Sequence, residues 1–374
     1  MDFDFSDEQI QFRGQVRRLL DDVCPLMEVR KTLDGAQPYS NATWRALAEM
    51  GFQSAAVPQA YGGLGLGELE LCVAAEEIGR ALAPVPSLSS VYVCTEAIRL
   101  FGSHDQKQTW LPGLADGSLI GTWAAAESPG EVLPNRIETK FVGGELHGAK
   151  SPVLDGLVAN LALVLALGAS GEPELVICDL SGTGVAREAV DSIDPSRPLA
   201  RVRFDGAKAQ RLPVPDDGWQ TYRDLMNRAA ILLSFEQVGA ADRALWMARD
   251  YALQRFAFGR PIGANQAIKH KLANVFVKNE LGRVHAYYGA WALSTGSAEL
   301  SMAAAGARVA ALEASSFSAQ ENIQTHGGIG FTWQSDCQLF YRRARFLATA
   351  VGGVQAWNEQ LVNALEQNNE HGRA

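Results

Sequence analysis

Apolar residues recur at helical spacing through the first third of the chain. Ser6 stands where a helix cap is expected, and Phe12 and Val16 follow on one face of the predicted helix. The pattern continues to about residue 116 and is interrupted at residues 61–65, where glycines favour a turn. It predicts an all-helical N-terminal domain over residues 1–118.

Short apolar runs separated by Gly, Pro and Asp characterise the middle of the chain. They include residues 161–166, 175–178 and 202–204, and such runs between turn residues are typical of β-strands. The longest apolar stretch, around residues 161–169, is about half of the roughly 20 residues that a membrane helix needs, so it predicts a buried strand. We expect a β domain over residues 119–217.

Long helical stretches return after residue 218. Glycines interrupt them at residues 259–263, 296 and 327–328, which leaves about four helices, enough for a bundle. A polar tail, residues 367–374, is expected to fray. The whole pattern predicts a mostly α protein with a central β domain and a C-terminal helical bundle over residues 218–374.

Composition narrows the class of protein. The 374 residues are 47% hydrophobic, enough for a sizeable core, and 33 Lys and Arg against 42 Asp and Glu give a net charge of −9. An acidic protein is a poor partner for nucleic acid or anionic lipid, so we expect neither. The five cysteines are scattered without a CxxC pair, and the N-terminus lacks the basic start and apolar run of a secretion signal. These features predict a cytoplasmic protein without a disulfide framework or zinc site.

Several common catalytic and cofactor motifs are missing from the sequence. It contains no GxSxG, HExxH or Walker motif and no GxGxxG that opens a βαβ unit. Gly62, Gly63, Gly65 and Gly67 lack the preceding strand of a phosphate loop, so a turn is the favoured interpretation. The six histidines show no metal-ligand spacing. Only His326 is singled out, because the two glycines after it allow the backbone to approach a ligand closely.

Two clusters combine polar side chains with glycine turns. The first, residues 251–273, reads YALQRFAFGRPIGANQAIKHKLA, in which Arg255 ends one helix and Gln266 lies on the next. A guanidinium and an amide on such a turn can bind one anionic ligand, although a solvated arginine between two helices is the commoner case. The second, residues 322–333, reads NIQTHGGIGFTW and indicates close backbone approach.

Together the two clusters resemble the signatures of the acyl-CoA dehydrogenase family, flavoenzymes that introduce an α,β double bond into a CoA thioester. The segments VPQAYGGLGLGELELCVAAEEIGRALAP and FGSHDQKQTWLPGLADGSLIGTWA are similar to that family's N-terminal segments in content and order. The resemblance covers nearly the whole chain and implies an N-terminal helical domain, a middle β-barrel-like domain and a C-terminal four-helix bundle. It also implies an acyl-CoA substrate and, as the usual acceptor, an electron-transfer flavoprotein.

The FAD contacts of the family are carried over where the residues match. In the family these residues act across a subunit interface on a neighbour's flavin, so the resemblance implies a homo- or hetero-oligomer, usually a dimer of dimers. The implied contacts are Arg255 for the pyrophosphate, Phe258 and Gln266 beside the cofactor, and Gln324 with Gly327 and Gly328 on the adenosine side.

The catalytic base of the family is missing at both of its usual positions. The chemistry needs a carboxylate within reach of the substrate α-carbon, to take a proton while the β-hydrogen leaves as hydride. Alignment with the family puts Val351 at one position of the Glu and Ala229 at the other. Among nearby carboxylates, Asp224 and Glu236, only Glu236 shares the helix face of Ala229, at about 10 Å along the axis. Glu236 is a weak alternative base.

The segments that seat the flavin ring in the family also differ. Where the family has Thr-Glu-Pro followed by Gly-Ser-Asp, this chain has AESP followed by GE at residues 126–131. Where the family has Lys-Thr-Trp-Ile, this chain has KSPV at residues 150–153. The Thr hydroxyl and the Trp ring are missing. Features that serve a subunit's own flavin are therefore lost, whereas those lent to a neighbour's FAD are present.

This division resembles the non-catalytic subunit of heteromeric acyl-CoA dehydrogenases known from bacterial breakdown of steroid side chains. The resemblance implies a chain that contributes FAD contacts to a shared site and has weak or no activity alone. Two alternatives stay open. One is a self-sufficient homotetramer with a displaced base, and the other is a non-redox scaffold on the same fold.

Overall fold

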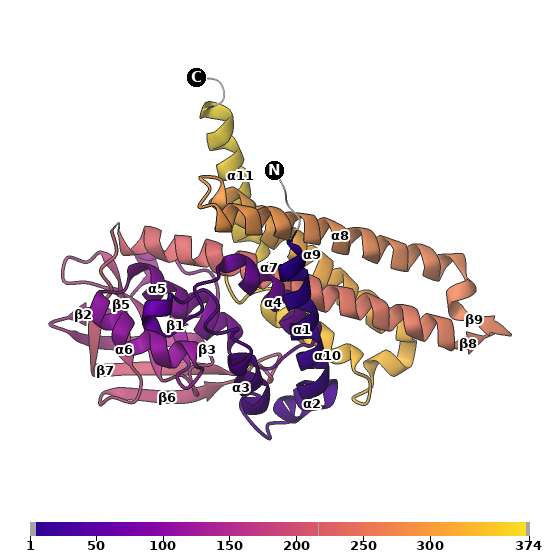
Figure 1. Ribbon diagram of the computed structural model, residues 1–374, viewed down its shortest axis with the longest axis horizontal. Coiled ribbons are helices and arrows are strands. Elements are labelled where there is room, and N and C mark those ends of the chain that lie inside the picture. Colours follow the sequence, from indigo (N-terminus) through magenta and orange to yellow (C-terminus); the bar gives the residue numbers. More distant parts are fainter. Residues whose placement is uncertain (1–4, 216, 372–374) are drawn as a thin grey trace. The chain divides into compact units, whose positions relative to one another are not determined.

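The computed structural model describes residues 5–215 and 217–371, which form two compact units (Figure 1). The bundle unit comprises the described parts of Met1–Val29, Cys72–Ala83 and Ala230–Ala374. The sheet unit comprises the described parts of Arg30–Leu71 and Pro84–Ala229. The domain boundaries expected from the sequence stay a prediction, because these units divide the chain differently.

Three helices contribute residues to both units. They are α2 (Leu26–Leu33), α4 (Glu68–Arg80) and α7 (Gly218–Gln254). Helix α7 is 37 residues long, and it begins in the sheet unit and ends in the bundle unit. A domain boundary placed where the β pattern stops therefore separates the first turns of α7 from the sheet unit, in which they pack.

The sheet unit is built around seven strands, all within the region predicted to be β. The pairings close into a ring, because β5 pairs with both β7 and β4. Strand β4 pairs in parallel with β1 and β2, whereas the other pairings are antiparallel. The ring confirms the predicted barrel-like middle region. The strands are β1 (Gly121–Ala124), β2 (Lys140–Val142), β3 (Glu145–Leu154), β4 (Leu161–Leu167), β5 (Pro173–Asp179), β6 (Val185–Val190) and β7 (Leu199–Arg211).

Strand β4 is the core strand of the ring. Its first six residues, 161–166, are all buried, and residues 175–178 of the neighbouring β5 are buried beside them. A strand buried on both faces has a continuous apolar run instead of an alternating pattern. The structure confirms the buried strand predicted for this stretch.

Four charged side chains form a hydrogen-bonded network in the sheet unit. Arg99 donates hydrogen bonds to both carboxylate oxygens of Glu96, at 2.7 and 2.8 Å, and to Glu68 at 2.6 Å. Arg228 donates to the same two carboxylates at 2.7 and 2.9 Å. Burial raises the pKa of Glu96, but the bonds and charges of the two arginines outweigh it and lower that pKa. The helical elements here are α3 (Asn41–Glu49), η1 (Gln59–Tyr61), the π-helix η2 (Ser87–Thr95), α5 (Glu96–Phe101), α6 (His104–Ala115) and η3 (Pro134–Arg136).

An ion pair between a buried lysine and a half-buried glutamate fixes the loop between β1 and β2. The Lys150 Nζ on β3 donates to Glu127 Oε1 at 2.6 Å and to the Ala125 carbonyl at 3.1 Å. Glu127 also accepts hydrogen bonds from the Glu138 and Thr139 N–H groups, both at 2.9 Å. Burial raises the pKa of Glu127, but Lys150 and the N–H donors outweigh it and lower that pKa.

The bundle unit is helical, with a short hairpin of β8 (Phe256–Ala257) and β9 (Arg260–Pro261) beyond α7. Ser6 caps α1 with a capping box, as the sequence predicts. Helices α8 and α9 run beside each other (Figure 1). Helix α11 continues to His371, into the tail that is expected to fray, and residues 372–374 lie outside the described chain. The fraying stays a prediction. The helices are α1 (Asp7–Val23), α8 (Gln266–Ser294), α9 (Leu300–His326), α10 (Cys337–Leu347) and α11 (Val354–His371), with short turns η4 (Ile262–Ala264) and η5 (Gly327–Phe331).

Among the described residues, none of the helices is both long enough and apolar enough to span a membrane.

Helices α4 and α7 cross at two glycines. A Cβ added to Gly79 would lie 1.9 Å from the Glu236 carbonyl oxygen, and one added to Gly239 would lie 1.9 Å from the Glu76 carbonyl oxygen. Each glycine therefore lets the backbone of the other helix approach to a distance that no side chain permits. The crossing sets the position of α7 in the bundle unit.

Ion pairs attach α4 to its other neighbours. Arg17 on α1 donates two hydrogen bonds to Glu77, at 2.7 and 2.8 Å. Glu76 forms ion pairs with Arg13 on α1, at 3.3 Å, and with Arg283 on α8. Both glutamates are buried, so their charges need these partners. Helix α4 is thus held from three sides.

We expect Gly239→Ala to lower the free energy of unfolding by about 3 kcal/mol or more, because the added methyl meets backbone that cannot move independently. Gly14→Ala is the matched control. Gly14 lies in α1, and an added Cβ meets only the end of Arg18 at 3.8 Å, so the better helix propensity of alanine should raise stability by up to about 1 kcal/mol. Urea unfolding measures both. Equal stability of Gly239→Ala and the unmodified protein would contradict the crossing.

We expect Lys150→Met to lower the free energy of unfolding by about 3 kcal/mol at neutral pH, because Glu127 is left with only its N–H donors. The folded-state pKa of Glu127 is lowered, so the pair stabilises the fold above the unfolded pKa of about 4.3, and this is lost as pH falls through the folded value. The difference between variant and unmodified protein should therefore shrink in acid. Lys208→Met, which removes an exposed ion pair to Glu145, should have little effect at any pH.

Candidate functional site

An arm of residues 255–265 follows the last residue of α7 (Figure 1). Strands β8 (Phe256–Ala257) and β9 (Arg260–Pro261) pair as a short hairpin with Phe258 and Gly259 in its turn. Both turn residues have positive φ, 52° and 78°, as in a type I′ turn. A phenylalanine in this region is strained, and the Phe258 side chain is fully exposed. Because the strained Phe258 backbone is not compensated by packing of its side chain within the chain, we expect the ring to contact another molecule.

Arg255 and Gln266 flank the arm. The Arg255 carbonyl accepts a hydrogen bond from the Ile262 N–H at 2.8 Å, which closes the base of the arm. The side chains of Arg255 and Gln266 are exposed, and neither has a hydrogen-bond or ion-pair partner in the part of the chain that the structure describes. Helix α8 begins at Gln266 without a side-chain cap. The arm therefore presents a guanidinium, an amide and a helix N-terminus, all suited to an anion.

The second predicted cluster lies at the end of α9. Gln324 is exposed, and the helix ends at His326 before Gly327, whose φ of 64° and ψ of −141° suit only glycine. A Cβ added to Gly327 or Gly328 would meet no atom of this chain within 4 Å. Packing inside the chain therefore does not require Gly328, and the space over both glycines is open to a group from outside.

A ring stack joins the two clusters. Tyr251, on the last turn of α7, stacks on His326 with ring centroids 4.1 Å apart and an interplanar angle of 25°. The Nδ1 of His326 is 2.9 Å from the Asn322 carbonyl oxygen. Burial lowers the pKa of His326, and the bond to Asn322 offsets part of that shift. The stack brings the residue before Gly327 against the helix turn that leads to Arg255.

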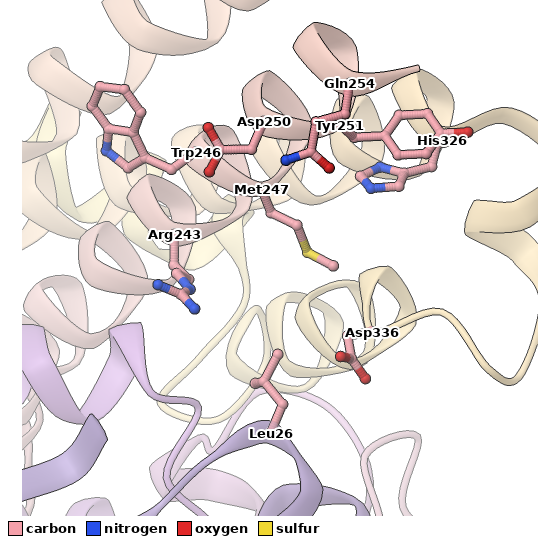
Figure 2. A pocket seen from close by; sticks show the side chains of 9 residues that line it. All are labelled: Leu26, Arg243, Trp246, Met247, Asp250, Tyr251, Gln254, His326 and Asp336. Carbon is pink, nitrogen blue, oxygen red and sulfur yellow. The ribbon is translucent and has the colours of Figure 1, made fainter. Parts of the chain in front are cut away.

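A cavity of about 390 Å³ opens beside this stack. Figure 2 shows the Met247 side chain extending into it between Leu26 below and the last turns of α7 above. Asp250 on its wall is paired with Arg249 at 3.0 Å. The lining residues are Leu26, Arg243, Trp246, Met247, Asp250, Tyr251, Gln254, His326 and Asp336.

Neither family base position carries an ionisable side chain in the structure. Val351 in the bundle unit is 7% exposed, and its carbonyl accepts a hydrogen bond from the Trp357 Nε1 at 3.1 Å. Ala229, in the sheet unit, is buried. Glu236, the alternative base, is fully buried in the bundle unit, where its carbonyl faces Gly79. Asp224 receives a hydrogen bond from Gln220 at 3.0 Å.

The polar groups of the predicted ring seat are bonded to one another. The Ser151 N–H donates to the Ala126 carbonyl at 2.8 Å, next to the Lys150–Glu127 pair. These donors and acceptors are thus bonded to partners within the sheet unit.

Some residues of this region carry no signal in the sequence pattern. Tyr251 opened the first cluster but carried no signal of its stack on His326. Three aromatic side chains beside the glycine turns are exposed: Phe256 is 62% exposed, Phe331 85% and Trp333 51%. Large exposed apolar residues beside glycine turns are the signal that would have marked them. Within residues 5–215 and 217–371, no group of three or more His, Cys, Asp and Glu is placed to hold a metal ion.

Comparisons with known proteins agree with this architecture. A model described as acyl-CoA dehydrogenase, N-terminal domain, matches residues 6–118, and one described as acyl-CoA dehydrogenase, C-terminal domain, matches residues 216–365. The acyl-CoA dehydrogenase IpdE2 of Mycobacterium tuberculosis is 32% identical over 84% of each chain. The acyl-CoA dehydrogenase FadE27 of the same organism is 28% identical over 98% of this chain and 99% of its own.

Solved structures share the fold over nearly the full length. A chain of the ChsE4-ChsE5 complex from Mycobacterium tuberculosis is 27% identical, with a TM-score of 0.89 over 98% of this chain and 99% of its own. A chain of a Tcur3481-Tcur3483 steroid ACAD variant is also 27% identical, with a TM-score of 0.88 over 97% and 99%. The helical, barrel-like and bundle architecture expected from the sequence is confirmed. The chain belongs to the acyl-CoA dehydrogenase family, which consists of flavin oxidoreductases.

Proposed function

We propose that this chain is a subunit of an FAD-dependent acyl-CoA dehydrogenase complex and lends FAD contacts to a second chain of the same family. The main support for the proposal is that the polar side chains predicted to contact FAD are exposed and unpaired within the described chain. Arg255, Gln266 and Gln324 are exposed and have no side-chain partner among the described residues. Groups unused in their own chain are available to a partner.

The residues at the end of the bundle unit fit the nonreacting half of FAD. Arg255 offers a planar fork to the diphosphate oxygens. Phe258 presents a whole ring face for packing. Gly327 and Gly328 leave open the space that a Cβ would fill, so the adenosine side can approach the backbone there, next to Gln324.

In the proposed reaction, an acyl-CoA thioester gains an α,β double bond. A bound flavin would supply the acceptor for the hydride that leaves the β-carbon. Because Val351 and Ala229 carry no carboxylate, the partner chain supplies the base that takes the α-proton. This chain's residues hold and orient the cofactor, which sets where its reacting ring lies relative to that base.

The substrate and the partner are supported by two relatives. The Tcur3481-Tcur3483 protein is a steroid ACAD, and the ChsE4-ChsE5 structure is of a complex. We extend both features to this chain and propose an acyl-CoA from steroid side-chain degradation and a heteromeric assembly. An electron-transfer flavoprotein as acceptor and a cytoplasmic location are parts of the same proposal that rest on the sequence.

The first test is the visible flavin spectrum of the chain purified alone, recorded with its solution mass. We expect a colourless protein that is not a tetramer, which becomes yellow when co-purified with a second acyl-CoA dehydrogenase chain. A yellow homotetramer with one FAD per chain would contradict the proposal and favour the self-sufficient enzyme. Glu236→Gln would then test the alternative base. A colourless protein with every such partner chain would favour the non-redox scaffold.

The second test is Arg255→Gln in the flavin-containing complex. Loss of a charged hydrogen bond to the diphosphate, about 1.5–3 kcal/mol, should raise the Kd of FAD roughly 10- to 100-fold. Arg249→Gln is the matched control, because Arg249 is also exposed on the last turns of α7 and bonds Asp250. Fluorescence titration of the apo-complex with FAD measures both. An unchanged Kd for Arg255→Gln would remove Arg255 from the site.

A further inference from the structure

Asn265 stands at the N-cap of α8 but does not cap it. An Asn at this position ordinarily accepts a hydrogen bond from an N–H of the first helical turn. Here the side chain makes no cap bond. Its Oδ1 accepts from Arg260 Nη2 at 2.6 Å, and its Nδ2 donates to the Ile262 carbonyl at 3.0 Å. Both ends of the amide are directed at the arm instead of the helix.

The arm needs such support. Its two strands have two residues each, and a hairpin of this size is not stable by its own backbone pairing. Its turn also carries the strained Phe258. Arg260 directly follows the turn on β9, so the Arg260–Asn265 bond connects the strand beyond the turn to the start of a 29-residue helix. The bond limits the movement of the turn relative to α8.

The same arrangement leaves the start of α8 available. Because Asn265 is used by the arm, the first N–H groups of α8 receive no side-chain cap, and the positive end of the helix stays open beside Gln266. One side chain thus holds the arm and keeps an anion-binding helix end uncovered.

We propose that Arg260 and Asn265 are positioning residues for FAD, which hold the arm so that Arg255, Phe258 and Gln266 are presented together. This rests on the proposed function. The pair acts through the arm, and neither residue needs to touch the cofactor. Asn265 is the more informative of the two, because an arginine so near the predicted diphosphate site could bind it directly, whereas the Asn265 amide is already occupied at both ends.

The test uses the flavin-containing complex and three variants. Asn265→Ser keeps a good N-cap residue but is too short to make either arm contact, so the stability of α8 is preserved. Arg260→Ala removes the donor, and Arg260→Lys keeps a single charged donor. Lys278→Ala, which removes an exposed link to Glu313 elsewhere on α8, is the control. FAD titration gives the Kd, and hydrogen–deuterium exchange of residues 256–262 without flavin reports the order of the arm.

We expect Asn265→Ser and Arg260→Ala to raise the Kd of FAD about tenfold and to speed exchange in the arm, with unchanged melting temperatures. Arg260→Lys should recover most of the affinity, and Lys278→Ala should match the unmodified complex. Normal affinity in Asn265→Ser with weak affinity in Arg260→Ala would make Arg260 a direct ligand and overturn the positioning role. If the unmodified chain contributes to no flavin site with any partner, both proposals fail. If the unmodified complex binds FAD and the Asn265→Ser and Arg260→Ala complexes bind it equally well, only the positioning role fails.

Discussion

The contact between the backbones of α4 and α7 fixes the bundle unit. Because Gly79 and Gly239 allow carbonyl groups of the opposite helix within the space of a missing Cβ, α7 can sit at only one position along α4. In this position, Glu76 and Glu77 on α4 form ion pairs with arginines on α8 and α1. The crossing therefore determines the position of the C-terminal end of α7 within the bundle unit. It also determines the position of the arm that begins at Arg255.

The sequence predicts the parts of the fold that depend on local pattern. The Ser6 cap, the buried β4 and the helix ends near residues 259 and 327 are all set by nearby residues and are confirmed. The closure of the sheet was expected only from the family resemblance, since β5 meets β4 and β7 through pairings that no spacing encodes. The glycine crossing was not anticipated at all, because a glycine within a helix carries no record of what lies against it.

The candidate site divides in the same way. Its polar residues were found because two motifs occur together, and their roles stay predictions. The ring stack of Tyr251 on His326 could not be predicted, because it joins residues 75 positions apart that no periodicity relates. Asn265 shows how one local interaction can replace another. An Asn at the N-cap ordinarily accepts a hydrogen bond from the helix, but a charged donor five residues earlier, Arg260, competes with a neutral N–H for the same oxygen and forms the stronger bond.

The retained and lost features of the family obey one physical rule. An exposed arginine or glutamine without a protein partner is hydrated by water. Arg255, Gln266 and Gln324 therefore do not destabilise the chain when no ligand is bound. A seat for a buried flavin ring is different, because its polar groups would be desolvated and unsatisfied whenever the ring is absent. In this chain the corresponding segment satisfies itself through Lys150 and Glu127. A subunit that folds before it binds its partner can therefore keep exposed residues that contact the partner's cofactor at little cost in stability. An empty flavin pocket of its own would leave buried polar groups unsatisfied, so its loss stabilises the free subunit.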